Sequence, residues 1–131
     1  MVLKIFFTLI LILVHFTSNA QRDTIAVNDN WQFVVDKKSE GINAKWNESV
    51  LANSRSVKLP HTWNIEEENQ NHYSWGWYQK KINIPANWRN KNLVLEFGAI
   101  NHTSFVYVNG KKVAENIGDG FNKFIINMNG K

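Results

Sequence analysis

The chain has 131 residues, with 15 basic and 11 acidic side chains and no cysteine. This length fits one ordinary domain, and the basic residues are scattered, which argues against a nucleic-acid partner. Because no disulfide can form, stability has to come from packed apolar side chains, and an aromatic content of 13% supplies large ones.

The first twenty residues are predicted to be a secretory signal peptide. Lys4 supplies a positive charge, residues 5–14 are apolar except for one threonine, and Ser18-Asn19-Ala20 offers small side chains for cleavage. The alternative, a membrane anchor, is disfavoured because the apolar run is about half of the ~20 residues that a membrane span requires. We therefore expect residues 21–131 to form a domain that is exported, periplasmic or extracellular, with no membrane attachment after cleavage.

Most of residues 21–131 alternates between apolar and polar side chains, which is the pattern of half-buried strands. The alternation occurs at 31–35, 57–59, 78–84 and 93–97. Asn109-Gly110 separates two further strand-like segments, and its tolerance of positive φ predicts a tight hairpin. Helical signals are limited to one or two turns, at 44–52 and 86–89. These elements predict an all-β fold, an antiparallel β-sandwich.

Three motifs follow one another in a specific order. They are Lys58-Leu59-Pro60-His61-Thr62-Trp63-Asn64, Tyr73-Ser74-Trp75-Gly76-Trp77-Tyr78-Gln79-Lys80-Lys81 and Phe105-Val106-Tyr107-Val108-Asn109-Gly110-Lys111. Together they resemble the N-terminal sugar-binding, jelly-roll domain of glycoside hydrolase family 2, in its β-galactosidase-like form. The resemblance covers the chain from about Trp31 to its end.

The resemblance implies an antiparallel jelly-roll or galactose-binding-like sandwich that acts as an accessory domain of an exported hydrolase. It implies a carbohydrate partner, a β-glycoside, and downstream immunoglobulin-like and (β/α)₈ barrel domains of the same enzyme. No cofactor is expected. In this family the jelly roll continues beyond the strand at 124–127, so we expect further strands to follow residue 131. The family alone leaves open which sugar is recognised.

The first motif is interpreted as structural. His61 has the chemistry of a general base or a metal ligand, but no serine, cysteine or carboxylate stands at a spacing that suggests a partner. By the resemblance, this block packs where the sandwich meets the rest of the enzyme, with His61 and Thr62 holding a turn after Pro60. The residues predicted to be structural are Pro60, His61, Thr62, Trp63, Asn109 and Gly110.

Trp75 and Trp77 allow two interpretations, because an indole ring can stack on a pyranose or fill a core. We expect Trp77 and Tyr78 to face opposite ways, since they are neighbours in a strand. Asp119, in Gly118-Asp119-Gly120, matches a loop that in the family reaches toward the active-site mouth. The alternative for Asp119 is a solvated turn. The candidate substrate-binding residues are Asp119, Trp75 and Trp77.

Catalytic residues and a metal site are not predicted. Glycoside hydrolysis usually requires two carboxyl groups, one of them protonated to act as an acid. Glu66-Glu67-Glu68 is the one cluster of acids, and it is interpreted as a solvated loop. Two other classes of function stay open: a free-standing carbohydrate-binding module that uses Trp75, Trp77 and Tyr73, and a structural sandwich without a role in sugar binding.

Overall fold

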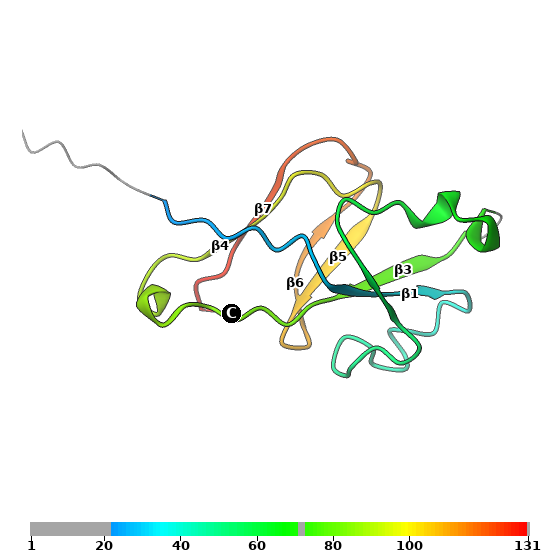
Figure 1. Ribbon diagram of the computed structural model, residues 1–131, viewed down its shortest axis with the longest axis horizontal. Helices are drawn as coiled ribbons and strands as arrows, with labels where there is room; N and C mark the ends of the chain where they lie inside the picture. Colours follow the sequence, from blue (N-terminus) through cyan, green and yellow to red (C-terminus); the bar gives the residue numbers. More distant parts are fainter. Residues whose placement is uncertain (1–21, 71–72, 131) are drawn as a thin grey trace, which may run out of the picture.

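The computed structural model describes residues 22–70 and 73–130, so the predicted signal peptide lies outside the described residues. Within them the fold is all-β and antiparallel, as predicted (Figure 1). The strands are β1 (Trp31–Asp36), β2 (Arg55–Val57), β3 (Trp75–Gln79), β4 (Val94–Phe97), β5 (Ser104–Val108), β6 (Lys111–Asn116) and β7 (Phe124–Asn127). Single 3₁₀ turns form η1 (Trp63–Ile65), η2 (Glu67–Asn69) and η3 (Ala86–Trp88).

The strands form three small sheets, ordered β2-β1-β3, β4-β7 and β5-β6. Figure 1 shows the β1–β3 sheet toward one end of the molecule, the β4–β7 pair toward the other, and the β5–β6 hairpin between them. The hairpin turns at Asn109 and Gly110, with φ of 50° and 79°. Both residues tolerate this left-handed conformation, so the hairpin prediction is confirmed.

Three of the predicted elements need correction. The strand expected at 57–59 is β2, which ends at Val57, because β1 pairs only with residues 55–57. The strand expected through residue 84 ends at Gln79, because β1 supplies ladder partners to β3 only as far as the Gln32–Gln79 pair. The helical turns expected at 44–52 are a series of loop turns, in which Lys45 takes a left-handed φ of 55° that a right-handed helix does not allow. The turn expected at 86–89 is confirmed as η3.

Neighbouring aromatic residues of β3 pack into two different layers. Tyr78 lies 4.7 Å, centroid to centroid, from Phe33, whose side chain is 2% exposed. Trp77 points the other way and stacks on Tyr107 of β5 at 6.1 Å. β3 therefore joins the core beside β1 to the layer beside β5, and the opposite orientation of Trp77 and Tyr78 is confirmed.

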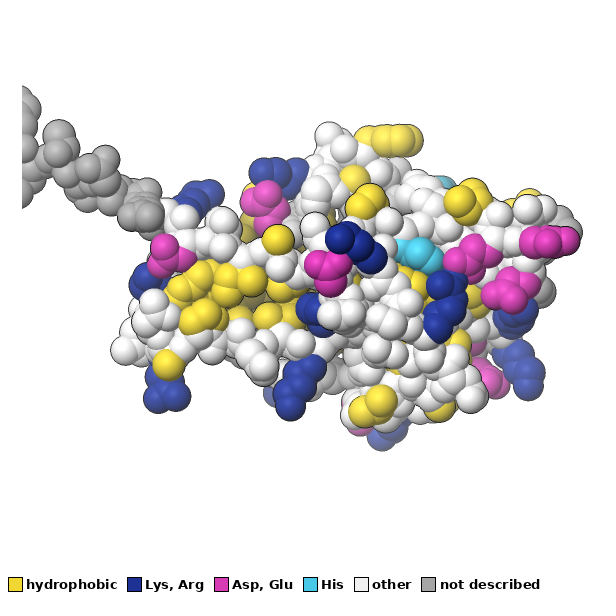
Figure 2. All heavy atoms as spheres, in the orientation of Figure 1, with side chains coloured by type: hydrophobic (Ala, Val, Ile, Leu, Met, Phe, Trp, Pro, Cys, Tyr) yellow, Lys and Arg dark blue, Asp and Glu magenta, His cyan; other side chains and the backbone are white. Residues whose placement is uncertain are grey.

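The β4–β7 pair has one packed face and one open face. Its inner side holds Ile126, 5% exposed, and the stacked rings of Phe97 and Phe124, 5.9 Å apart. Its outer side carries Val94 and Ile125, which are 57% and 55% exposed. Figure 2 shows hydrophobic side chains gathered at this end of the molecule, in a hollow beside β4 and the N-terminal segment.

Candidate functional site

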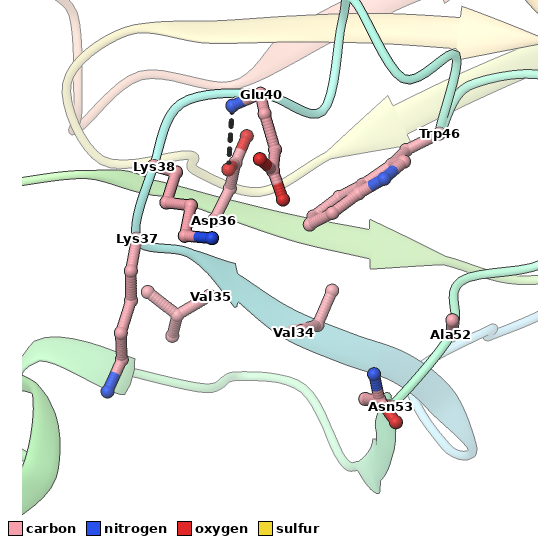
Figure 3. A pocket seen from close by; sticks show the side chains of 9 residues that line it. All are labelled: Val34, Val35, Asp36, Lys37, Lys38, Glu40, Trp46, Ala52 and Asn53. Atoms are coloured by element: carbon pink, nitrogen blue, oxygen red, sulfur yellow. Dashed lines mark hydrogen bonds between the residues drawn. The ribbon is translucent and has the colours of Figure 1, made fainter.

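A buried carboxylate, Asp36, organises the end of β1. Its Oδ1 accepts a hydrogen bond from the Glu40 backbone N–H at 2.9 Å (Figure 3), and its Oδ2 accepts one from the Gly41 N–H at 2.8 Å. The indole N–H of Trp77 also donates to Oδ2, at 3.2 Å. Asp36 is 2% exposed, and three donors compensate for the burial of its charge. Asp36 was not predicted from the sequence, because its partners are set by the fold.

A second polar cluster centres on Glu66, just after η1. Its Oε1 accepts from the Arg55 guanidinium of β2 and lies 3.2 Å from Nε2 of His61, while its Oε2 accepts from the Asn69 side chain at 2.9 Å. The hydrogen bond from Arg55 is the main reason that the pKa of Glu66 lies below its ordinary value. Glu66 therefore holds β2, the 58–62 segment and η2 together.

These contacts correct two parts of the sequence interpretation. His61 does have a carboxylate partner, Glu66, five residues further on. That spacing spans a 3₁₀ turn and follows neither strand nor helix periodicity, so the sequence pattern gave no signal. Of the three adjacent acids, Glu67 and Glu68 are exposed as expected, whereas Glu66 is half-buried and paired.

Tyr78, His61 and Glu66 form a chain that has the connectivity of a proton relay. The Tyr78 hydroxyl lies 2.7 Å from Nδ1 of His61, whose Nε2 faces Glu66. Burial and the nearby negative charge of Glu66 raise the pKa of Tyr78 to about 12. A nucleophile needs the opposite shift, toward its ionised form. The chain therefore joins strands and loop, in keeping with the structural role predicted for His61.

The rest of the first motif lies around the same core. Trp63 packs closely against Gly76: a Cβ added to this glycine would lie 2.9 Å from Nε1 of Trp63. Pro60 precedes His61, whose ring packs edge-on against Phe33 at 4.8 Å. Thr62 precedes η1, and its hydroxyl makes no capping hydrogen bond, so the part expected for Thr62 in the turn after Pro60 stays a prediction.

The two candidate tryptophans of β3 differ in their surroundings. Trp77 is enclosed by Tyr107, by Trp46 at 5.8 Å and by Asp36, so its ring and its N–H are both occupied within the domain. Trp75 is 42% exposed and rests on Phe105 at 5.4 Å. Of the two, Trp75 offers the more accessible ring.

Asp119 lies in the loop between β6 and β7 and is partly exposed. Its Oδ1 accepts the backbone N–H groups of Phe121 and Asn122 at 3.1 and 3.2 Å, and its Oδ2 accepts the Asn122 side-chain amide at 2.9 Å. The bond from that amide is the main cause that lowers the pKa of Asp119. The carboxylate thus shapes its own loop, and its contact with a substrate stays a prediction.

The structure brings Asp119 and Trp75 to the same end of the sandwich. Asn116 pairs with Ser104 at the start of β5, and its side chain also donates to the Asp119 carbonyl. The ring of Phe105, the next residue of β5, packs against the ring of Trp75. Two of the three candidate substrate-binding residues therefore lie near this end, while Trp77 packs deeper along the same strand.

The fold and this arrangement define a class, an antiparallel β-sandwich with exposed aromatic and carboxylate groups at one end. The sequence matches the family described as "Glycosyl hydrolases family 2, sugar binding domain" over residues 25–128. The chain belongs to this family, which confirms the resemblance at the level of the family.

Two relatives known by sequence are both named beta-glucuronidase. The chain is 31% identical to the protein from Bacteroides fragilis over 124 residues, which are 92% of this chain and 16% of that protein. It is 28% identical to the protein from Paenibacillus borealis over 97 residues, which are 72% of this chain and 16% of that protein. The chain thus spans about a sixth of the length of these relatives.

Solved structures show the same fold. A beta-glucuronidase from an uncultured Clostridium species has a TM-score of 0.72 and 30% identity, with 79% of this chain and 19% of that chain covered. The beta-glucuronidase of Ruminococcus gnavus has a TM-score of 0.71 and 26% identity, with 79% and 18% covered. The antiparallel sandwich predicted from sequence is therefore confirmed.

Proposed function

We propose that this chain is the N-terminal accessory domain of a family 2 hydrolase that cleaves β-glucuronides. The observation that carries the proposal is the similarity along most of the chain to proteins named beta-glucuronidase. The motifs of the chain fit a β-galactosidase-like enzyme as well, and the names of the relatives are what favours a glucuronide over a galactoside. The whole enzyme then has a β-glycoside as its carbohydrate partner.

We further propose that the catalytic carboxyl groups lie outside this chain. A glycosidase requires one carboxyl group that stays protonated, which means a raised pKa. The pKa values of Glu66 and Asp119 shift the other way, and Asp36 is committed to three N–H donors. The small share of each relative that the chain covers leaves room for the immunoglobulin-like and (β/α)₈ barrel domains that the family implies.

Within such an enzyme, Trp75 and Asp119 are the residues we propose to face the substrate. Both lie toward the end of the sandwich where β5 begins, and each has accessible polar or aromatic surface. A carboxylate orients sugar hydroxyls through charge-assisted hydrogen bonds. Asp119→Ala in the full-length enzyme is then expected to lower kcat/KM about tenfold, which corresponds to about 1.4 kcal/mol.

The substrate assignment is tested by the kinetics of the full-length enzyme on 4-nitrophenyl β-D-glucuronide, β-D-galactoside and β-D-mannoside. We expect kcat/KM to be highest for the glucuronide by at least tenfold. A higher value for the galactoside would overturn the choice of sugar and leave the family unchanged. Turnover of any of the three by residues 21–131 alone would overturn the proposal that this domain is non-catalytic.

Export completes the proposal, and its support is the pattern of residues 1–20. None of the helices among the described residues has the length and apolar character that a membrane span requires. Mass spectrometry of the protein recovered from outside the cytoplasm should find Gln21 as the first residue. Recovery there with Met1 intact would contradict cleavage at this site.

A further inference from the structure

The loop between β6 and β7, which carries Asp119, lies against the loop between β4 and β5. Figure 1 shows the two loops running side by side at one end of the molecule. They meet at Gly120, where an added Cβ would lie 2.6 Å from the side-chain oxygen of Asn101 and 3.0 Å from the backbone nitrogen of His102. The Asn101 side chain can rotate, but the His102 backbone cannot, so this close approach requires a residue without a side chain. The two loops therefore form one packed unit.

The backbone of Asp119 is also tied to the strands of the sandwich. Asn116 is the last residue of β6, and it pairs with Ser104, the first residue of β5. The side-chain amide of Asn116 donates a hydrogen bond to the Asp119 carbonyl. Asp119 is therefore held between this bond on one side and the contact at Gly120 on the other, so its Cα has a fixed place relative to β5 and β6.

The carboxylate of Asp119 is held at both of its oxygens. Its Oδ1 accepts two backbone N–H groups, from Phe121 at 3.1 Å and from Asn122 at 3.2 Å. These two bonds alone would let the carboxylate pivot about Oδ1. The side-chain amide of Asn122 donates to Oδ2 at 2.9 Å and removes that freedom. A carboxylate has about four acceptor sites, so these three bonds leave one site on Oδ2 without a partner among the described residues.

We propose that Asn122 is a positioning residue for glycoside hydrolysis, because its amide orients Asp119 so that the remaining acceptor site of Oδ2 meets one hydroxyl of the substrate. This role rests on the proposed function, in which Asp119 faces the substrate. A carboxylate that is already oriented loses less conformational freedom on binding, so more of the strength of its charge-assisted hydrogen bond is retained. The hydrogen bond from Asn122 is also the largest cause that lowers the pKa of Asp119, which favours the ionised form that accepts hydrogen bonds.

A positioning role and a purely structural role of Asn122 lead to different expectations. If Asn122 only shaped the loop, its removal would affect activity equally with and without the Asp119 carboxylate. A positioning residue acts through that carboxylate, so its removal has no further effect once Asp119 has been replaced by alanine. Asn122 is exposed, so its substitution leaves the core of the domain intact.

The test is a double-mutant cycle in the full-length enzyme, measured with whichever of the three 4-nitrophenyl glycosides it cleaves best. Asn122→Ala should lower kcat/KM about fivefold, less than the roughly tenfold loss for Asp119→Ala, because the backbone donors still hold Oδ1. Asn122→Ala combined with Asp119→Ala should match Asp119→Ala alone within about 1.5-fold. The matched control is Asn87→Ala, which removes an exposed amide outside both loops and should leave kcat/KM unchanged.

A second variant, Asn122→Asp, gives a readout that a structural role would not move. Its new carboxyl group faces that of Asp119 in place of the amide, and two like charges so close raise the pKa at which one of them takes up a proton. The bound proton restores a donor to Oδ2, so the activity of this variant relative to the wild type should rise as the pH is lowered. His102 and Lys123, the other titratable residues of the two loops, are present in both enzymes and cancel in this ratio.

Three results would overturn the positioning role: no loss of activity in Asn122→Ala, an equal loss with and without the Asp119 carboxylate, or a relative activity of Asn122→Asp that does not change with pH. No effect of Asp119→Ala itself would overturn this role together with the substrate contact of Asp119. A failure of the sugar assignment can be told apart from all of these, because it changes which glycoside is cleaved best and leaves the cycle intact.

Discussion

The two ends of the molecule are held together in different ways. The three-stranded end, β1–β3 with its loops, has polar hubs that join distant segments: Asp36 holds Trp77, 41 residues away, and Glu66 holds Arg55 and His61. The two-stranded end, β4 and β7 with residues 80–93, has exposed apolar side chains on both strands; the three-stranded end exposes apolar side chains as well, chiefly outside its strands, at Ile42, Val50 and Ile65. At the two-stranded end, Ile84, Val94 and Ile125 are 50%, 57% and 55% exposed.

This difference shows where the described residues close their own core. At the three-stranded end, the buried side chains of Asp36 and Asn69 meet partners that fix loops, whereas the buried hydroxyl of Ser74, just before β3, has no partner among the described residues. At the two-stranded end, every second side chain of β4 and β7 faces outward, and no other layer of the described residues covers these side chains. Exposed apolar surface of this kind is where a further element of structure typically packs. The predictions below test whether stability is divided in this way.

The largest expected effect is the loss of Phe33 from the three-stranded end. Phe33→Ala should lower the free energy of unfolding by about 3–5 kcal/mol, because it removes a fully buried ring and leaves a cavity between His61 and Tyr78. Ile125→Ala at the two-stranded end, where the side chain is 55% exposed, should cost less than about 1 kcal/mol. Urea denaturation of both variants measures the contrast. Equal losses would show that the two ends are equally closed.

Asp36→Asn should be the next largest, at about 1–3 kcal/mol. The amide keeps the shape of the carboxylate. Three N–H groups donate to the Asp36 carboxylate, so the NH₂ group of asparagine would face at least one of them and that hydrogen bond would be lost. Trp77 should lose part of its fixed orientation, so the near-ultraviolet circular dichroism should weaken together with the melting temperature. Asp23→Asn, at an exposed acid paired only with Lys91, is the control and should change neither.

The Glu66 cluster should make stability depend on pH. The pKa of Glu66 is lowered in the folded state, mainly by the hydrogen bond from Arg55. Glu66 therefore stabilises the folded state at pH values above its pKa in the unfolded chain. The contribution is lost as pH falls through the folded pKa. Glu66→Gln should cost about 1 kcal/mol at pH 7, a value reduced for solvent screening. Melting curves of wild type and variant should converge in acid, and a constant gap at all pH values would rule out this linkage.

An effect of similar size to that of Glu66→Gln is expected at the turn that links the hairpin to the three-stranded end. Gly110→Ala should cost about 1 kcal/mol, because φ is +79° and the new Cβ would lie 3.1 Å from Cγ of Glu48. Gly98→Ala is the matched control, since a Cβ there meets nothing within 4 Å and the residue has no left-handed φ. A thermal melt that does not separate the two variants would show that the contact with the 47–48 loop carries no strain.

Much of the fold could be predicted from local sequence. Asn109-Gly110 indicated the hairpin because the tolerance of positive φ belongs to those two residues in any context. The alternation around Trp77 and Tyr78 indicated that they face opposite sides, since this follows from strand geometry alone. The family was also recognisable from three motifs in order. The same patterns predicted too long a strand at 80–84, because alternation does not say whether a ladder partner exists.

The candidate site was predictable only in part. Asp119 and Trp75 were named from the sequence, and the structure brings them to one end of the sandwich. The pairing of His61 with Glu66 and the burial of Asp36 were missed, and the choice for Trp77 between sugar stacking and the core was left open. Each depends on a side chain from another element, and no spacing in the sequence reports such a contact.

Residues within a few positions of one another were enough to indicate the all-β class, the tight turn and the alternating faces, and three short motifs in order were enough to indicate the family. Contacts between distant segments fixed which polar groups are buried and what they bind, where β3 ends, and which aromatic rings stay accessible. A buried charge or donor is stable only beside its partner. The partners of Asp36 and Glu66 are brought together by the pairing of strands that are distant in the chain.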